Sequence, residues 1–107
     1  LGARVGSRAA ERLLARHACA VRDVAHWAVH AGGTAVLKEL AAKLNLQADA
    51  LKASDHVFRN FGNMSSPTVL FALRRVLDVE QPEPGASGLL LAFGAGFTGH
   101  AALLEFI

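Results

Sequence analysis

The chain has 107 residues, of which 52% are hydrophobic and 19% charged, and its net charge is +2; it forms one domain at most and is too apolar for a disordered segment. Basic residues are interspersed with acidic ones and only Arg74 and Arg75 are adjacent, so the charge pattern does not indicate a nucleic-acid-binding surface. The longest apolar stretches are far shorter than the roughly 20 residues that span a bilayer, so no membrane segment is predicted.

The first part of the chain is predicted to form a helix, a strand and a second helix. Apolar side chains recur at helical spacing over residues 7–21. Residues 24–30 then alternate, as the two faces of a strand do. The glycine pair at 32–33 makes a tight turn, and Thr34 caps a helix that runs to about residue 44. Strand, glycine turn and helix together form one α/β unit.

The second part is predicted to contain two helices and a terminal pair of strands. Residues 49–61 form a helix that stops at Gly62, a residue suited to a left-handed cap. Pro67 fits the first turn of the next helix, which Ser65 or Ser66 caps. The apolar surface of that helix is wide enough for it to be mostly buried. A surface loop and two short strands follow, at residues 79–88, 89–93 and about 101–106.

Three residues are candidates for chemistry. His30 ends the predicted strand beside the glycine turn, where open α/β sheets place ligands, although a core histidine bonded to a backbone carbonyl fits the position equally well. Asn63 follows a helix stop and, taken alone, is an ordinary turn residue. Cys19 is the single cysteine, lies in the predicted first helix and is expected to be buried and unreactive. The other four histidines are expected to be structural or exposed.

The single cysteine also bears on compartment and metal binding. It excludes an internal disulfide and favours a reducing, cytoplasmic setting. No cysteine or histidine cluster has the spacing of zinc ligands, so no metal site is predicted.

Three sequence motifs occur in a characteristic order: WAVHAGGTAVL at 27–37, FGNMSS at 61–66 and GLLLAFGAGFT at 88–98. Together they resemble the C-terminal half of type III polyketide synthases, the chalcone-synthase-like enzymes. That family has a histidine followed by a Pro-Gly-Gly turn, then GNMSS about thirty residues later, then a GFGPG loop before the final strand. The resemblance covers nearly the whole chain.

The chain departs from this pattern in two places. Ala31 stands where the family usually has proline, and AFGAGF at 92–97 stands where GFGPG is usual. Both departures resemble the very-long-chain 3-ketoacyl-CoA synthases, which share the thiolase fold. Met64 favours the polyketide synthases, because the elongation enzymes more often have GNTSS at this motif. The polyketide synthases are therefore the first hypothesis.

The resemblance implies an α/β, thiolase-like fold, of which residues 1–107 are the C-terminal portion. The half that carries the nucleophilic cysteine would be absent. Each half of this fold is expected to have a five-stranded mixed sheet with flanking helices and a final antiparallel strand pair. One of two strands preceding Leu1 would separate the His30 strand from the terminal pair. Without the preceding half, the helix after Ser66 would also lose cover and expose Phe71, Leu73 and Leu77. For both reasons the chain alone is expected to be inactive and to aggregate or remain loosely packed.

The resemblance also implies an activity and a set of site residues. The enzyme would be an acyltransferase that condenses malonyl-CoA onto an acyl-CoA starter by decarboxylative Claisen chemistry, as a homodimer and without a cofactor. His30 and Asn63 match the two donors to the thioester carbonyl. Substrate-lining residues would be Ser65, Gly94, Ala95 and Gly96. The alternatives are a 3-ketoacyl-CoA or acyl-carrier-protein synthase of fatty acid elongation, and a non-catalytic, truncated or diverged subunit.

Overall fold

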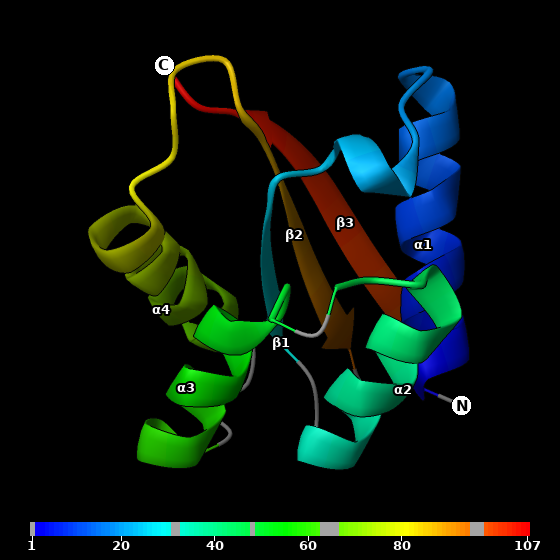
Figure 1. Cartoon of the computed structure of the whole chain (residues 1–107). Helices are drawn as coiled ribbons and strands as arrows, with labels where there is room; N and C mark the ends of the chain where they lie inside the picture. The colour runs from blue at the N-terminus through cyan, green and yellow to red at the C-terminus, as the bar shows by residue number, and fades with distance from the viewer. Residues whose placement is uncertain (1, 31–32, 48, 63–66, 95–97) are drawn as a thin grey trace.

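A three-stranded mixed sheet lies between two groups of helices in the computed structural model of the chain (Figure 1). The structure describes residues 2–30, 33–47, 49–62, 67–94 and 98–107. In chain order the elements are α1 (Gly2–Arg16), η1 (Val21–Asp23), β1 (His26–His30), α2 (Thr34–Leu44), α3 (Lys52–Phe61), α4 (Pro67–Arg75), the π-helical turn η2 (Val76–Glu80), β2 (Ser87–Gly94) and β3 (Thr98–Glu105).

The strand order is β1-β2-β3, with β1 parallel to β2 and β2 antiparallel to β3. The mixed sheet and its final antiparallel pair are as predicted. The expectation that another strand separates the His30 strand from the terminal pair is wrong, because β1 pairs directly with β2 and places His30 opposite Ala92. Strand order depends on contacts between distant segments, and a count of strands along the chain does not determine it.

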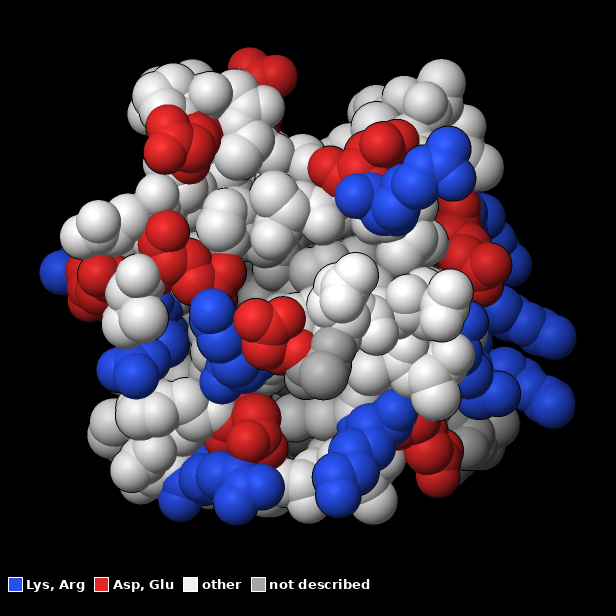
Figure 2. Space-filling view, viewed as in Figure 1, with Lys and Arg blue, Asp and Glu red and all other residues white. Residues whose placement is uncertain are grey.

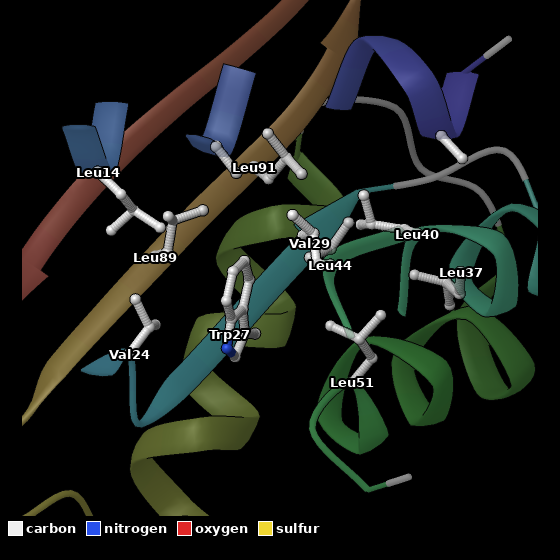
Figure 3. Packing of buried hydrophobic residues seen from close by; sticks show 12 residues of the cluster. Leu14, Val24, Trp27, Val29, Leu37, Leu40, Leu44, Leu51, Leu89 and Leu91 are labelled. Carbon is white, nitrogen blue, oxygen red and sulfur yellow. The ribbon is translucent and has the colours of Figure 1, made fainter. Parts of the chain in front are cut away.

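Both faces of the sheet are covered, because alternate residues of β1 enter two separate cores. Trp27 and Val29 belong to the larger core under α1 and α2, which Figure 3 shows from close by. Ala28 belongs to a smaller core with Val57 of α3 and Ala72 of α4. A parallel strand covered on both faces is expected to be apolar at successive positions, as β1 is. The larger core contains Leu14, Leu37, Leu40, Leu44, Leu51, Leu89 and Leu91.

The helix α4 is only partly buried in this chain. Ala72 and, in the following turn, Val76 are buried. Leu70, Phe71 and Leu77 remain 62%, 48% and 43% exposed. The apolar surface of the helix is wide, but only the side that faces β1 and α3 is covered. The exposure of Phe71 and Leu77 agrees with the expectation that the helix loses cover in this chain alone, whereas Leu73 is partly buried.

The helix ends agree with the turn chemistry of the sequence in one place and differ in another. α3 ends as predicted, with Gly62 at φ 70° and its N–H bonded to the Phe58 carbonyl at 2.8 Å. α2 starts one residue earlier than predicted, because the N-cap is Gly33 and Thr34, predicted as the cap, is the first helical residue. A one-residue difference of this kind is common at helix starts.

The basic residues of α1 form a stripe that the sequence analysis did not recognise. Arg4, Arg8, Arg12 and Arg16 recur every four residues, and all four are exposed. Residues at this spacing are neighbours on one face of a helix. Elsewhere on the face in Figure 2, positive and negative side chains are interspersed.

Candidate active site

The described elements that carry the three motifs end at the same edge of the sheet. β1 and β2 are parallel, so their C-terminal ends lie together, with His30 opposite Ala92. β3 starts at that edge, with Thr98 opposite Gly94. Figure 1 shows α3 ending and α4 beginning in the same lower half of the molecule. The fold therefore brings the C-terminal ends of β1 and β2 and the start of β3 together at the end of the sheet where α/β proteins place ligands.

His30 is the last residue of β1 and is only 7% exposed. Its Nδ1 atom is buried and has no hydrogen-bond partner among the described residues. An unpaired buried polar atom costs about 1 to 3 kcal/mol, so its presence in a folded chain calls for an explanation. No described backbone carbonyl accepts a hydrogen bond from His30 Nδ1. The structure therefore does not support the alternative of a core histidine bonded to a backbone carbonyl through this atom.

Burial also sets the protonation state of His30. Removal of the imidazole from water lowers the pKa of His30 from its ordinary value of 6.5, because the charged form loses its solvation. The side chain is therefore neutral at pH 7. A neutral imidazole has one N–H donor and one acceptor nitrogen, so it can donate one hydrogen bond without carrying a charge.

A side chain of α3 bonds the backbone of β1 beside His30. The Val29 N–H donates to Ser54 Oγ at 2.8 Å. Ser54 is 1% exposed, so water does not compete for this hydrogen bond. The contact joins the helix that precedes the GNMSS motif to the strand that ends at His30.

The remaining site residues predicted from the sequence are distributed as follows. Gly94 is the last residue of β2 and is paired with Thr98, at the same edge as His30. Asn63, Ser65, Ala95 and Gly96 lie outside the described residues. The structure thus places His30 and Gly94 at the same end of the sheet, and the roles of all six residues stay predictions.

Cys19 lies outside α1, contrary to the expectation of a helix that continues to about residue 21. Ala18 adopts a left-handed conformation at φ 53°, and α1 ends at Arg16. Cys19 is half-buried, its N–H bonds the Leu14 carbonyl at 2.9 Å, and it packs against the larger core. Along the chain, Cys19 is followed by η1 and then by the start of β1 at His26, whereas His30 is the last residue of that strand.

A partly buried hydrogen-bonded pair at the start of β1 was not predicted from the sequence. His26 Nδ1 and Glu80 Oε1 are 2.6 Å apart, and the two side chains are only 16% and 12% exposed. The Phe106 ring packs edge-on against the His26 ring, with the two ring centroids 5.6 Å apart. The pair lies at the far end of the strand from His30 and takes no part in the candidate site. No local pattern signals it, because its members are 54 positions apart.

Two further kinds of site were sought in the described part of the chain. No three histidine, cysteine, aspartate or glutamate side chains there are grouped as metal ligands would be. None of the helices described is long and apolar enough to cross a membrane.

Solved structures define the class of protein. The chain superposes on 1,3,6,8-tetrahydroxynaphthalene synthase from Streptomyces coelicolor with a TM-score of 0.87 and 35% identity, over 94% of this chain and 29% of that one. It superposes on PKS-I from the brown alga Ectocarpus siliculosus with a TM-score of 0.84 and 32% identity, over 98% and 29%. The 3-oxoacyl-(acyl carrier protein) synthase III of Pseudomonas aeruginosa, at 23% identity and a TM-score of 0.83 over 98% and 32%, shares the fold. The fold is thus the thiolase-like fold of condensing enzymes.

The sequence places the chain within that class. Residues 8–107 match the family described as chalcone and stilbene synthases, C-terminal domain, and the chain belongs to this family. It is 33% identical over 96 residues to 3,5-dihydroxyphenylacetyl-CoA synthase from Amycolatopsis balhimycina, covering 90% of this chain and 26% of that protein. It is 37% identical over 95 residues to the S. coelicolor tetrahydroxynaphthalene synthase, covering 89% and 25%. The chain spans about a quarter of the length of these relatives, and the resemblance to type III polyketide synthases is confirmed.

Proposed function

We propose that residues 1–107 are the C-terminal portion of a type III polyketide synthase that condenses malonyl-CoA onto an acyl-CoA starter. The observation that carries the proposal is the buried, neutral His30, whose Nδ1 has no partner among the described residues, at the edge where the motif-bearing elements end. A neutral donor in a site shielded from water suits the stabilisation of an oxyanion.

In the proposed reaction, a cysteine outside this chain first holds the starter as a thioester. Loss of carbon dioxide from malonyl-CoA breaks a carbon–carbon bond and leaves its electron pair in a thioester enolate. The enolate carbon bonds the carbonyl carbon of the cysteine thioester. Collapse of that tetrahedral intermediate breaks the carbon–sulfur bond, which frees the thiolate and leaves the lengthened chain on coenzyme A.

His30 and Asn63 are proposed as the two donors that stabilise the enolate oxygen. Preorganised donors of this kind typically lower a barrier by about 3 to 4 kcal/mol each. The lowered pKa of His30 is compatible with this role, because a neutral imidazole still has one N–H donor. A donor beside the nucleophilic thiol would also favour its thiolate form.

The cavity wall is proposed to include the glycine-rich segment after β2. Gly94 supports this because it lies at the same sheet edge as His30. Glycine lets the backbone approach a substrate closely, since it has no Cβ. The proposed lining residues are Ser65, Gly94, Ala95 and Gly96.

Three properties of the whole protein belong to the same proposal. The chain alone is proposed to be inactive, because its single cysteine, Cys19, precedes η1 and packs against the larger core, whereas His30 ends β1. A homodimer and a reducing, cytoplasmic location are proposed from the family resemblance and the single cysteine. Sedimentation of the full-length protein tests the dimer.

The second candidate is a 3-ketoacyl synthase of fatty acid elongation. Ala31 and the AFGAGF segment at 92–97 favour it, because these residues depart from the polyketide-synthase pattern. A non-catalytic subunit is the third candidate, favoured by the absence of a cysteine near His30 among the described residues.

Product analysis separates the three candidates. The full-length protein is incubated with malonyl-CoA and a series of acyl-CoA starters, and products are identified by liquid chromatography and mass spectrometry. A polyketide synthase releases carbon dioxide and forms products with several unreduced keto or aromatic groups. A single two-carbon extension, from malonyl-CoA or from malonyl-acyl-carrier protein, supports the elongation enzyme. No turnover with any starter supports the non-catalytic subunit.

A further inference from the structure

We propose that Ser54 is a positioning residue for His30, an inference that rests on the proposed function. Ser54 does not touch the reacting atoms in this assignment. It accepts the Val29 N–H at 2.8 Å and thereby fixes the backbone one residue before His30.

The position of β1 in the sheet explains why this hydrogen bond is needed. β1 is an edge strand of the described sheet, paired with β2 on one side only. Backbone N–H groups on its other side have no strand to bond, and a buried N–H without a partner is unfavourable. Ser54 Oγ supplies the acceptor at Val29. A helix side chain thus takes the place of a neighbouring strand at the site end of β1.

The His30 ring has no comparable bond of its own. Its Nδ1 is buried and unpaired among the described residues, so no hydrogen bond to that nitrogen fixes the ring. The position of the imidazole is therefore set by packing and by the backbone from which it projects. A small shift of the end of β1 therefore displaces the His30 imidazole by a similar distance.

Ser54 lies on the buried side of α3, which is packed in the fold. Ala53, Ser54 and Val57 are 2%, 1% and 2% exposed and form the inner surface of α3. Val57 packs against Ala28 of β1 and Ala72 of α4. The hydrogen bond therefore links His30 to a buried part of the fold.

The first test is Ser54→Ala in the full-length protein. Alanine favours helix, so α3 should remain while the acceptor is lost. We expect kcat for condensation to fall tenfold or more, with KM for the starter within threefold of wild type. Hydrogen exchange of the peptide fragment that covers β1, measured by mass spectrometry, should become at least tenfold faster at one amide. Unchanged kcat, or unchanged exchange in β1, overturns the proposal.

Two further variants separate positioning from loss of stability. Ser54→Thr keeps Oγ and should retain kcat within threefold. Val76→Ala removes buried volume beside His26, at the opposite end of β1 from His30, and should lower the melting temperature while leaving kcat per folded molecule within twofold. A fall in kcat for Val76→Ala as large as for Ser54→Ala overturns the proposal. If the added methyl group prevents Ser54→Thr from folding, Ser54→Ala and Val76→Ala still decide the question.

A readout specific to the site is the pH dependence of iodoacetamide inactivation. The midpoint of this inactivation follows the thiol pKa of the nucleophilic cysteine. Displacement of His30 in Ser54→Ala should raise that midpoint by half a pH unit or more, and Val76→Ala should leave it unchanged. An unchanged midpoint in Ser54→Ala counts against the proposal.

The outcomes also distinguish this proposal from the proposed function. If the wild-type protein does not condense malonyl-CoA, the function is wrong, and the exchange measurement still tests the link between Ser54 and β1. If Asn63→Ala abolishes condensation and Ser54→Ala does not, the function stands and the positioning role fails.

Discussion

The His26 imidazole and the Glu80 carboxylate join the first residue of β1 to the last residue of η2, with Nδ1 and Oε1 only 2.6 Å apart. Both side chains are largely buried, and the Phe106 ring covers the histidine. The contact connects the start of β1 to the C-terminal end of the long α4–η2 helix. It therefore stabilises the end of the sheet opposite the candidate site.

The first prediction concerns this pair. Glu80→Ala should leave the His26 nitrogen without its partner and lower the free energy of unfolding by about 1 to 3 kcal/mol. Urea unfolding of the full-length protein measures this change. Glu83→Ala is the matched control, because Glu83 is exposed and its side chain makes no hydrogen bond or ion pair in the described part of the chain. Equal stability of the two variants would contradict the assigned role of the pair.

The second prediction follows from the lowered pKa of His30. Burial favours the neutral form in the folded state, so the unfolded chain binds the proton more readily. The stability contributed by burying neutral His30 is complete above the unfolded pKa of 6.5 and decreases as the pH falls below it. His30→Gln should therefore lessen the loss of stability between about pH 6.5 and the lower folded pKa. Urea midpoints of wild type and variant, compared across that range, test the sign. Parallel curves would show that His30 is not held neutral.

The third prediction concerns the proposed donor Asn63. Asn63→Ala in the full-length protein should slow malonyl-CoA decarboxylation and condensation about a hundredfold or more, as expected for loss of an oxyanion donor. Acylation of the nucleophilic cysteine by the starter should survive, since that step does not use the enolate. Radiolabelled carbon dioxide and intact-protein mass measure the two steps separately. Near-normal product formation would remove Asn63 from the mechanism.

The fourth prediction is that Cys19 is not the nucleophile. It is packed against the larger core, in the turn between α1 and η1, and its N–H bonds the Leu14 carbonyl. Cys19→Ala should keep turnover of the full-length protein within a fewfold of wild type. An acyl adduct on Cys19 after incubation with a starter thioester, located by peptide mass spectrometry, would refute this prediction.

Local signals in the sequence predicted the local structure well. Gly62 ends α3 because glycine accepts a positive φ at little cost, and α2 begins within one residue of its predicted start. The end of α1 was missed because Ala18 takes up the left-handed conformation. Alanine does not favour the left-handed conformation, so Ala18 did not indicate that the helix ends before it.

Long-range relationships could not be predicted in the same way. The direct pairing of β1 with β2 and the bond from Val29 to Ser54 both depend on how distant segments pack. The extent to which α4 is covered is a related case: the width of an apolar face shows how much surface is available to cover, and it does not show what covers it. His30 was singled out because strand end, glycine turn and family motif all pointed to one residue, and its role stays a prediction.

The last prediction concerns residues 1–107 expressed alone. One reason to expect a poorly folded segment no longer holds, because β1 and β2 pair directly and their ladder needs no strand between them. The other reason remains. Figure 1 shows α3 and α4 side by side, and their apolar residues stay exposed in this chain. The exposed set is Phe61, Leu70, Phe71, Leu77 and Val79, and the Phe61 and Phe71 rings lie 6.1 Å apart.

An apolar surface of this kind promotes association, since its burial between two copies releases it from water. We expect the isolated segment to be inactive and to self-associate at micromolar concentration. The double variant Leu70→Lys, Phe71→Ser should raise the monomer fraction in sedimentation, because both side chains are about half exposed and their replacement leaves the sheet contacts of α4 intact. Matched substitution of Arg8 by lysine, on the exposed face of α1, should change nothing. A monomeric wild-type segment with a sharp thermal transition would show that this face needs no cover, and would favour a self-sufficient domain.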